Sequence, residues 1–306
     1  MALNPKSLAQ RAAARAIEKS VQVADVATKY WFYPALEPMT SPTLIMIHGY
    51  RGNHHGLEAQ AGALTGINLV IPDLPGFGQS SPFSKEHTVA NYSIWLADFI
   101  RALKLEQRPF LLGHSFGSLI VSHHVTNFDD VSALILQNPV SAPALEGPKA
   151  FLTAVSKSFF ALAEKLSPKL GEWLLKSWPM VRGMSILMTK SRDRSLRTWV
   201  HRQHDANFND FATRDVAIQG YRASISACVG DFAAGISIPT LILAGERDDI
   251  TSVEQQRQMV ALIPHQNWRL RVIEKVGHLS HYETPEIVSD EIKNFVKKIA
   301  TDSRIG

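Results

Sequence analysis

Short apolar stretches recur along this chain and alternate with segments of helical spacing, in which apolar residues return every three or four positions. Six short stretches rich in apolar residues predict strands, at 43–47, 68–71, 110–112, 131–136, 239–244 and 268–273. Segments of helical spacing predict helices at 53–65, 88–103, 118–125, 253–262 and 285–299. Residues 21–33 predict one or two further strands near a sheet edge. Because the strands leave no polar face, we expect a mostly parallel, twisted sheet with helices on both sides.

The alternation of strands and helices stops between residues 140 and 235. No stretch there predicts a buried strand, and the apolar residues follow helical spacing instead. The large ones include Val155, Phe159, Leu162, Trp173, Trp178 and Trp199. We therefore expect a helical insertion at 140–235, with most of these side chains in its own core, between two parts of one sheet domain at 1–139 and 236–306.

A serine stands between two glycines directly after the strand at 110–112. The sequence is Gly113-His114-Ser115-Phe116-Gly117, and a helical pattern follows it. A sharp turn from strand to helix exposes the serine hydroxyl and leaves no room for Cβ atoms at the two flanking glycines. The context predicts that Ser115 is a nucleophile.

A serine nucleophile needs a base, and the base needs an acid that orients it. In an α/β sheet the chemistry collects at the carboxyl ends of the strands. Glu246, Asp248 and Asp249 follow the strand at 239–244, and His278 follows the strand at 268–273. The strand at 131–136 is followed by Asn138 and by no acid. The chain thus has the order Ser, Asp, His, which is expected of α/β-hydrolases.

With these motifs the chain resembles the α/β-hydrolase family, in particular esterase, lipase-like and C–C hydrolase members that carry a helical cap. The resemblance covers residues 43–300 apart from the insertion. Its motifs are His48-Gly49, the loop at 73–80, the turn at Ser115, Gly245 with Asp248, and Gly277-His278 followed by Glu283 and Pro285. It implies the α/β-hydrolase fold, a cap at 140–235, and a serine hydrolase that needs no cofactor.

Two departures from the family pattern narrow this expectation. Ser118 stands where many relatives have a further glycine, and residues 50–56 are not the Gly-rich form of ring-cleavage-product hydrolases. The second departure argues against C–C bond hydrolysis. Ser115 itself argues against haloalkane dehalogenase and epoxide hydrolase chemistry, since those relatives use an aspartate nucleophile.

The expected roles follow the chemistry of acyl transfer. Ser115 attacks the acyl carbonyl, His278 takes its proton and passes it to the leaving group, and Asp248 holds the imidazole. The backbone N–H groups of Tyr50 and Phe116 are the expected oxyanion donors.

Glu246 and Asp249 compete with Asp248 for the role of the acid. The spacing Gly-x-x-Asp from Gly245 favours Asp248, and we expect Asp249 to cap the next turn. His281 competes with His278, whose preceding glycine suits a tight turn.

Other histidines are expected to be structural. His114 lies beside the nucleophile but points away from the turn. The histidine pairs at 54–55 and 123–124 are candidates for a metal site. However, adjacent histidines on a helix face different directions, and no cluster of further ligands lies at suitable spacing. We therefore predict no metal site.

The charge pattern does not indicate a nucleic-acid partner. Residues 140–235 hold thirteen Lys and Arg against eight Asp and Glu, a net charge of +5 in a chain of net charge +4. No basic cluster is interleaved with aromatic residues. The arginines Arg192, Arg194, Arg197 and Arg202 are expected on a solvated face. The loop at 76–81 lacks the third glycine of a dinucleotide site, and we expect Asp73 to be a hydrogen-bonding residue of this loop.

The number of cysteines and the lengths of the apolar runs indicate the cellular location to be expected. Cys228 is the single cysteine of the 306 residues, so no intrachain disulfide forms and a reducing, cytoplasmic location is expected. No apolar run approaches the length of a membrane span. The segment 1–20 lacks the features of a secretory signal and predicts an amphipathic surface helix.

These observations predict a carboxylesterase that acts on a small to medium apolar ester through an acyl-enzyme. Hydrolysis of a C–C bond or a thioester uses the same catalytic residues and remains an alternative. An alternative of another class is a small-molecule receptor on the same fold that does not hydrolyse its ligand. The sequence does not indicate an oligomeric state.

Overall fold

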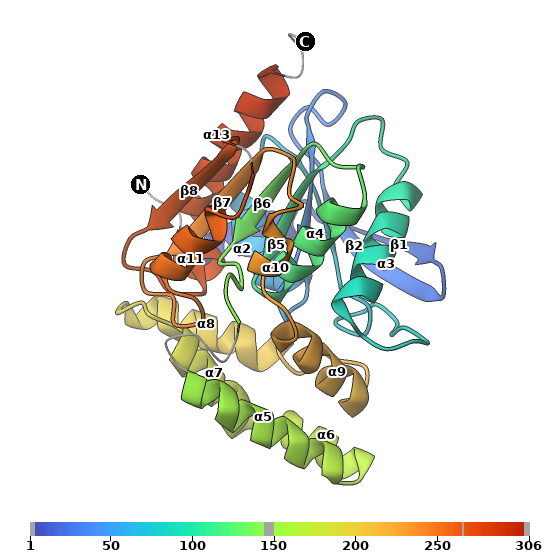
Figure 1. The fold of residues 1–306 in the computed structure, drawn as a ribbon, viewed down its shortest axis with the longest axis vertical. Helices are drawn as coiled ribbons and strands as arrows, with labels where there is room; N and C mark the ends of the chain where they lie inside the picture. The colour runs from blue at the N-terminus through green and yellow to red at the C-terminus, as the bar shows by residue number, and fades with distance from the viewer. Residues whose placement is uncertain (1–3, 144–149, 265, 303–306) are drawn as a thin grey trace.

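In a computed structural model of the chain, which describes residues 4–143, 150–264 and 266–302, eight strands form one sheet flanked by helices (Figure 1). The strands are β1 (Ile17–Val23), β2 (Val26–Tyr33), β3 (Thr43–Ile47), β4 (Asn68–Pro72), β5 (Phe110–His114), β6 (Ala133–Gln137), β7 (Thr240–Gly245) and β8 (Trp268–Ile273). Their order across the sheet is β1-β2-β4-β3-β5-β6-β7-β8. All neighbouring pairs from β4 to β8 are parallel, whereas β1 and β2 form an antiparallel hairpin at one edge.

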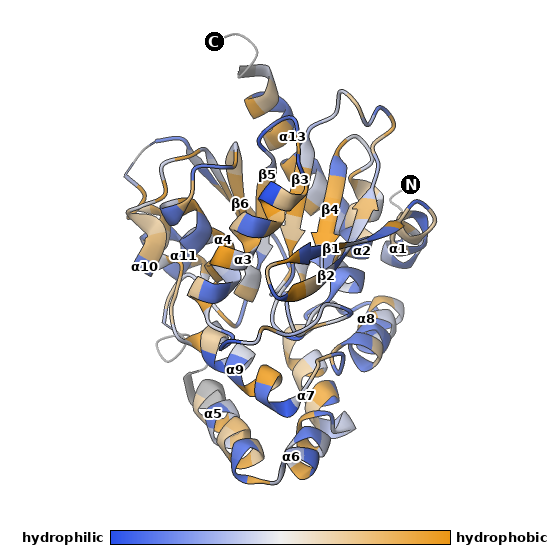
Figure 2. Ribbon diagram, turned by 90° about the vertical axis from the view of Figure 1, so that its right-hand side faces the viewer, coloured by the Kyte–Doolittle hydropathy of each residue, from blue (hydrophilic) through white to orange (hydrophobic). Residues whose placement is uncertain are grey.

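Helices cover both faces of the sheet, as the apolar strands predict. The helices that precede β6 or follow β7 in the chain are α1 (Pro5–Ala13), α2 (Glu58–Ala63), α3 (Val89–Ala102), α4 (Phe116–Asn127), α11 (Val253–Val260), α12 (Ser280–Glu283) and α13 (Pro285–Asp302). Ile45 and Ile47 of β3 pack in one core with α3, α4 and α11, while Leu44 and Met46 face a second core with α2 and α13. Figure 2 shows these apolar strands between more polar helix surfaces.

Two predicted helices in the first part of the chain differ from the structure in detail. Residues 1–3 of the predicted N-terminal helix lie outside the described part, and α1 ends at Ala13, because the chain enters β1 at Ile17. The predicted helix at 53–65 begins as a 3-10 turn, η1 (His54–Leu57), which Asn53 caps by accepting a hydrogen bond from the N–H of His55 at 3.1 Å.

Strand β8 has an exposed side that we did not expect. It lies at the sheet edge, and its residues alternate between exposed and partly buried as far as Ile273. Arg269 and Arg271 there reach Glu291 of α13 at 3.2 and 3.0 Å. An edge strand has only one strand neighbour, so charged side chains remain accessible to water there.

A helical segment lies between β6 and β7, at one end of the sheet (Figure 1). It consists of α5 (Ala150–Lys165), α6 (Pro168–Leu175), α7 (Trp178–Met188), α8 (Arg194–Asn207) and α9 (Arg214–Ile225), and the short α10 (Gly230–Ala233) follows. Residues 144–149 of the predicted insertion lie outside the described part. In that part, no strand lies between β6 and β7.

The expectation that the tryptophans of this helical segment are core residues is wrong for two of them. Trp173 and Trp178 are 71% and 62% exposed, and Val155 and Leu162 of α5 are also exposed. Helical spacing predicts that these apolar residues lie on one face of their helix. It does not predict whether that face packs against the rest of the protein or is exposed to solvent.

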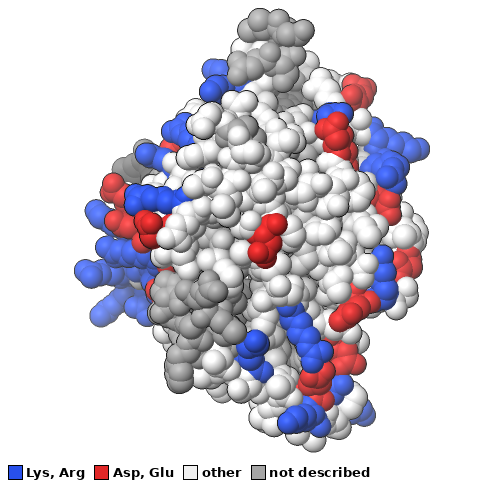
Figure 3. Space-filling view, in the orientation of Figure 1, with Lys and Arg blue, Asp and Glu red and all other residues white. Residues whose placement is uncertain are grey.

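Charged residues are distributed over the surface of both parts. The four arginines predicted on a solvated face, Arg192, Arg194, Arg197 and Arg202, are exposed. In Figure 3, basic and acidic side chains are interspersed over the lower part of the molecule, where the helical segment lies. Among the described helices, none is both long and apolar enough to cross a membrane.

Candidate active site

Strand β5 leads into α4 through a tight turn at Ser115. Ser115 has φ 52° and ψ −119°, a left-handed backbone conformation that costs about 1–3 kcal/mol for a residue other than glycine. The N–H of Ser115 donates to the carbonyl of Gln137 on the neighbouring β6 at 3.1 Å. The turn thus places the serine at the carboxyl end of the sheet, as its sequence predicts.

The two glycines of this turn are required by close backbone contacts. A Cβ atom at Gly113 would lie 2.4 Å from the carbonyl oxygen of Gly117. One at Gly117 would lie 2.4 Å from the carbonyl oxygen of Ile47, on the adjacent β3. The sequence argument for small residues on both sides of Ser115 therefore has a direct steric basis.

Ser118, a departure from the family pattern, holds the turn in place. Its hydroxyl donates to the carbonyl of Ser115 at 2.5 Å and accepts from the N–H of Val140 at 3.2 Å. Ser118 therefore links the turn to the segment after β6. The sequence shows that Ser118 follows Gly117 of the turn, but it does not show that its hydroxyl bonds to Ser115 and Val140.

The structure brings together the three side chains predicted as nucleophile, base and acid. The Ser115 hydroxyl lies 2.7 Å from Nε2 of His278. Nδ1 of His278 lies 2.9 and 3.1 Å from the two carboxylate oxygens of Asp248. His278 and Asp248 are buried, whereas Ser115 is half-buried and thus partly open to a substrate. With Nδ1–H donated to the carboxylate, Nε2 is free to accept the serine proton.

Further hydrogen bonds orient the carboxylate of Asp248. The N–H of Ile250 donates to one oxygen at 2.8 Å, and the side-chain amide of Asn138 donates to the other at 3.0 Å. The amide oxygen of Asn138 accepts from the hydroxyl of Ser280 at 2.5 Å, which fixes the amide orientation. Sequence reasoning found Asn138 after β6 but passed over it because it is not an acid.

The competing acids have other partners. Asp249 pairs with Lys190, and the cap of α11 is Ser252, so the structure shows a different contact from the cap expected for Asp249. Glu246 accepts from the N–H of Lys275 at 2.8 Å. Neither carboxylate has a hydrogen bond to His278 among the described contacts.

Two other histidines are buried behind His278. Nε2 of His114 lies 3.2 Å from the carbonyl oxygen of His278, and the rings of His114 and His281 are 4.1 Å apart. Burial and the neighbouring His278 lower the pKa of His114 to about 3. Burial and the neighbouring histidines also lower the pKa of His281 well below its ordinary value. Both rings are therefore neutral at physiological pH.

The predicted oxyanion donors lie on backbone segments beside Ser115. Phe116 is the first residue of α4, where N–H groups have no partner within the helix. Tyr50 lies in a turn closed by a hydrogen bond from the N–H of Gly52 to the carbonyl of Gly49, at 3.0 Å. A Cβ atom at Gly49 would lie only 3.2 Å from Cβ of Ser115, so this turn passes directly against the serine.

Aromatic side chains from both parts of the chain surround Tyr50. Its hydroxyl donates to the carbonyl of Ala217 in α9 at 2.6 Å. The rings of Phe77, Phe160 and Tyr221 lie 5.9–6.2 Å from the Tyr50 ring, and Phe160 stacks on Tyr221 at 3.9 Å. Helices α5 and α9 thus supply an apolar wall close to the turn that holds Tyr50.

One group of side chains among the described residues could hold a metal ion, namely His54, His55 and Glu58, whose ligand atoms lie within 4.8 Å of one another. The premise that the adjacent histidines point apart is wrong, because the 3-10 turn brings their rings to 3.9 Å. Each already has a carboxylate partner: Nδ1 of His54 contacts Asp73 at 2.9 Å, and Nδ1 of His55 contacts Glu58 at 3.1 Å.

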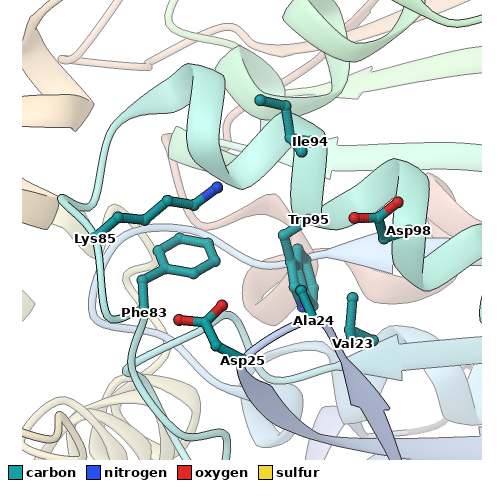
Figure 4. Close-up of a pocket in the computed structure, with 8 residues that line it drawn as sticks. All are labelled: Val23, Ala24, Asp25, Phe83, Lys85, Ile94, Trp95 and Asp98. Atoms are coloured by element: carbon teal, nitrogen blue, oxygen red, sulfur yellow. The ribbon is translucent and has the colours of Figure 1, made fainter.

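Asp73 fixes its loop, as the sequence predicts. It accepts hydrogen bonds from the N–H groups of His54 and Gln79, both at 2.8 Å. A depression elsewhere, between the β1–β2 turn and α3, is lined by residues that include Asp25, Phe83 and Trp95 (Figure 4). None of its lining residues belongs to the group around Ser115.

Comparison with known proteins places this architecture in a family. A family model described as "alpha/beta hydrolase fold" matches residues 42–285. The chain is 25% identical to Lipase 1 of Psychrobacter immobilis over 257 residues, which cover 82% of this chain and 76% of that protein. It is 27% identical over 274 residues to 3-oxoadipate enol-lactonase 1 of Acinetobacter baylyi, with 86% and 91% covered.

A solved structure shows the same fold over almost the whole chain. An esterase from Exiguobacterium antarcticum superposes with a TM-score of 0.73 at 21% identity, covering 92% of this chain and all of that one. The residues that the family model matches, 42–285, include every strand from β3 to β8. The expected fold and family are confirmed: the chain belongs to the α/β-hydrolase fold family and is an α/β-fold hydrolase.

Proposed function

We propose that this protein is a serine carboxylesterase that works through an acyl-enzyme. The observation that carries the proposal is the continuous hydrogen-bonded series from Ser115 through His278 to Asp248. The imidazole of His278 lies 2.7 Å from the hydroxyl, within reach for proton transfer, and a buried carboxylate orients the ring.

The reaction follows from these positions. Oγ of Ser115 attacks the ester carbonyl while Nε2 of His278 takes the hydroxyl proton. The carbonyl oxygen becomes an oxyanion, which the N–H groups of Tyr50 and Phe116 stabilise. The intermediate collapses, the C–O bond to the alcohol breaks, and His278 protonates the alcohol as it leaves. Water, activated by His278, then attacks the acyl-enzyme and releases the carboxylic acid. No step calls for a metal or an organic cofactor.

The helical segment at 140–235 acts as the cap in this proposal. Phe160 and Tyr221 on the cap stand against Tyr50, so a substrate seated on the oxyanion donors would meet an aromatic wall. Burying apolar surface is worth about 25 cal/mol per Å², which favours an apolar acyl or alcohol group of modest size. The named activities of two relatives, a lipase and an enol-lactonase, are also consistent with cleavage of a carboxylic ester.

Replacement of the nucleophile tests the proposal. We expect Ser115→Ala to abolish hydrolysis of p-nitrophenyl butyrate, while Ser158→Ala, at an exposed position of α5, leaves it unchanged. A panel that adds a thioester and a vinylogous diketone separates ester hydrolysis from thioester and C–C bond hydrolysis. Turnover of the ester by Ser115→Ala at the wild-type rate would overturn the proposal. Tight binding of a panel compound without product release would favour a receptor instead.

A further inference from the structure

The Arg51 side chain leaves the turn beside Ser115 and enters the cap, where it is almost completely buried, at 1% exposure. Its Nε donates to the carbonyl of Phe208 at 2.9 Å. Its Nη2 donates to the carbonyl of Leu175 at 3.0 Å and to the side-chain oxygen of Asn209 at 2.8 Å. A single side chain of the sheet domain therefore contacts two separate helices and a loop of the cap.

The remaining contacts of the guanidinium are uncharged. Nη1 lies 3.3 Å from the sulfur of Met180, and the cation stands over the ring of Phe211 at 5.2 Å. Among the described contacts of Arg51, none is to a carboxylate. Burial lowers the pKa of Arg51, but an arginine remains charged at neutral pH.

A buried charge without a counterion is costly and must be compensated by dipoles. Leu175 is the last residue of α6, and Phe208 is the C-cap of α8. Carbonyl groups at helix C-termini carry the negative end of the helix dipole and favour a cation. Two helix ends therefore converge on one guanidinium, and Arg51 has this compensation only while the cap is seated on the sheet domain.

The backbone of Arg51 is constrained as well. Arg51 has φ 59°, in the left-handed region, and it occupies the third position of the turn from Gly49 to Gly52. Glycine or asparagine usually takes that position, so arginine there costs about 1 kcal/mol or more. Such a conformation persists when the surroundings fix it, and the side-chain contacts in the cap supply that constraint.

We propose that Arg51 is a positioning residue for the oxyanion site, which it couples to the seating of the cap. Tyr50, the preceding residue, supplies one of the two oxyanion donors if the proposed function is correct. When the guanidinium is held by the cap, the turn is fixed and the N–H of Tyr50 is directed at the substrate. When these contacts are lost, the turn relaxes and the donor is misplaced.

A second arginine of the same kind provides a matched control. Arg15 donates only to carbonyl groups, of Pro34 and Ala61 at 2.6 Å and of Leu64 at 3.1 Å, and it anchors the segment after α1. None of its described contacts is with the turn at Gly49–Gly52 or with Ser115. Arg15→Met therefore removes a half-buried arginine from carbonyl partners without touching the oxyanion site.

The test measures kcat and KM for p-nitrophenyl butyrate, and the inhibition constant of phenylboronic acid, which forms a tetrahedral adduct with a serine. Loss of an oxyanion donor lowers kcat by about 100- to 1,000-fold, and a misplaced donor lowers it less. We therefore expect Arg51→Met to lower kcat by roughly 10- to 50-fold with KM within about 3-fold, because the lost contact acts in the transition state. Inhibition by the boronate weakens in parallel, while Arg15→Met changes neither quantity.

Two further variants keep the test decisive. Arg51→Lys keeps the charge but not the planar fork, and we expect an intermediate kcat. If Arg51→Met does not fold, Asn209→Ala serves instead, because it removes one acceptor while Arg51 stays. We expect this variant to lower kcat while KM changes little. If the wild type is active and the Arg51 and Asn209 variants have unchanged kcat and boronate inhibition, this inference is wrong while the proposed function stands. A wild type without esterase activity overturns the proposed function first, and this inference with it.

Discussion

Asn138 donates a 3.0 Å hydrogen bond to the carboxylate of Asp248, which in turn accepts from the ring of His278. Replacement by alanine leaves that oxygen of a buried carboxylate without its amide donor. We expect Asn138→Ala to lower kcat for ester hydrolysis by about 10-fold, because a buried carboxylate that loses a hydrogen-bond donor orients and stabilises the ring of His278 less well. Steady-state kinetics check this. Asn127→Ala, at the exposed end of α4, is the control, and equal kcat in both variants would contradict the role of Asn138.

The two buried serines of α4 should differ in their contribution to stability. The Ser118 hydroxyl bonds to Ser115 and to Val140, whereas the Ser122 hydroxyl is buried without a partner among the described residues. Ser118→Ala leaves the buried N–H of Val140 without its acceptor, while the carbonyl of Ser115 keeps the N–H of residue 118 at 2.8 Å, and we expect a reduction of the free energy of unfolding by about 1–3 kcal/mol. Ser122→Ala should be neutral or stabilising. Urea denaturation of both variants measures the difference, and equal midpoints would refute it.

Glycine at position 117 should be indispensable. The Cβ atom of Gly117→Ala would meet a carbonyl oxygen of β3 at 2.4 Å, so the turn must shift or the protein must unfold. We expect a loss of at least about 3 kcal/mol of stability, or no folded protein. Gly183→Ala is the matched control, because nothing lies within 4 Å of its Cβ position on α7, and it should stabilise by about 0.5–1 kcal/mol. Equal thermal midpoints in the two variants would show that the contact at Gly117 relaxes freely.

The buried neutral histidines should make stability depend on pH. In the unfolded chain His114 titrates near its ordinary pKa of about 6.5. In the folded chain burial lowers that pKa to about 3. The unfolded state therefore binds more protons between these values, and the free energy of unfolding decreases as the pH falls from about 6.5 toward 3. We expect His114→Gln to have a shallower decrease in urea denaturation between pH 7 and 5, and an unchanged slope would contradict this explanation.

The sequence predicted the turn at Ser115 and its partners because each lies next to a strand end and has a distinctive residue type. The glycines at 113 and 117 have steric reasons that hold wherever this turn occurs. Asn138 was missed because an amide after a strand has many ordinary uses. Its function depends on Asp248, which lies 110 residues further along the chain.

The role of Arg51 could not be predicted for a related reason. Its nearest acceptors in the helical segment between β6 and β7 are 124 residues or more away in sequence, and they are backbone carbonyl groups, which carry no sequence signal. The exposure of Trp173 and Trp178 was missed as well, because helical spacing does not say which side of these helices packs against the rest of the protein.

The account rests on Ser115 as the nucleophile, and covalent labelling tests this most directly. The wild-type protein is treated with a fluorophosphonate, and the labelled peptide is identified by mass spectrometry. We predict one adduct, on Ser115, that is absent in Ser115→Ala and forms much more slowly in His278→Ala, which lacks the base. Labelling of another residue, or undiminished labelling of Ser115→Ala, would contradict the account.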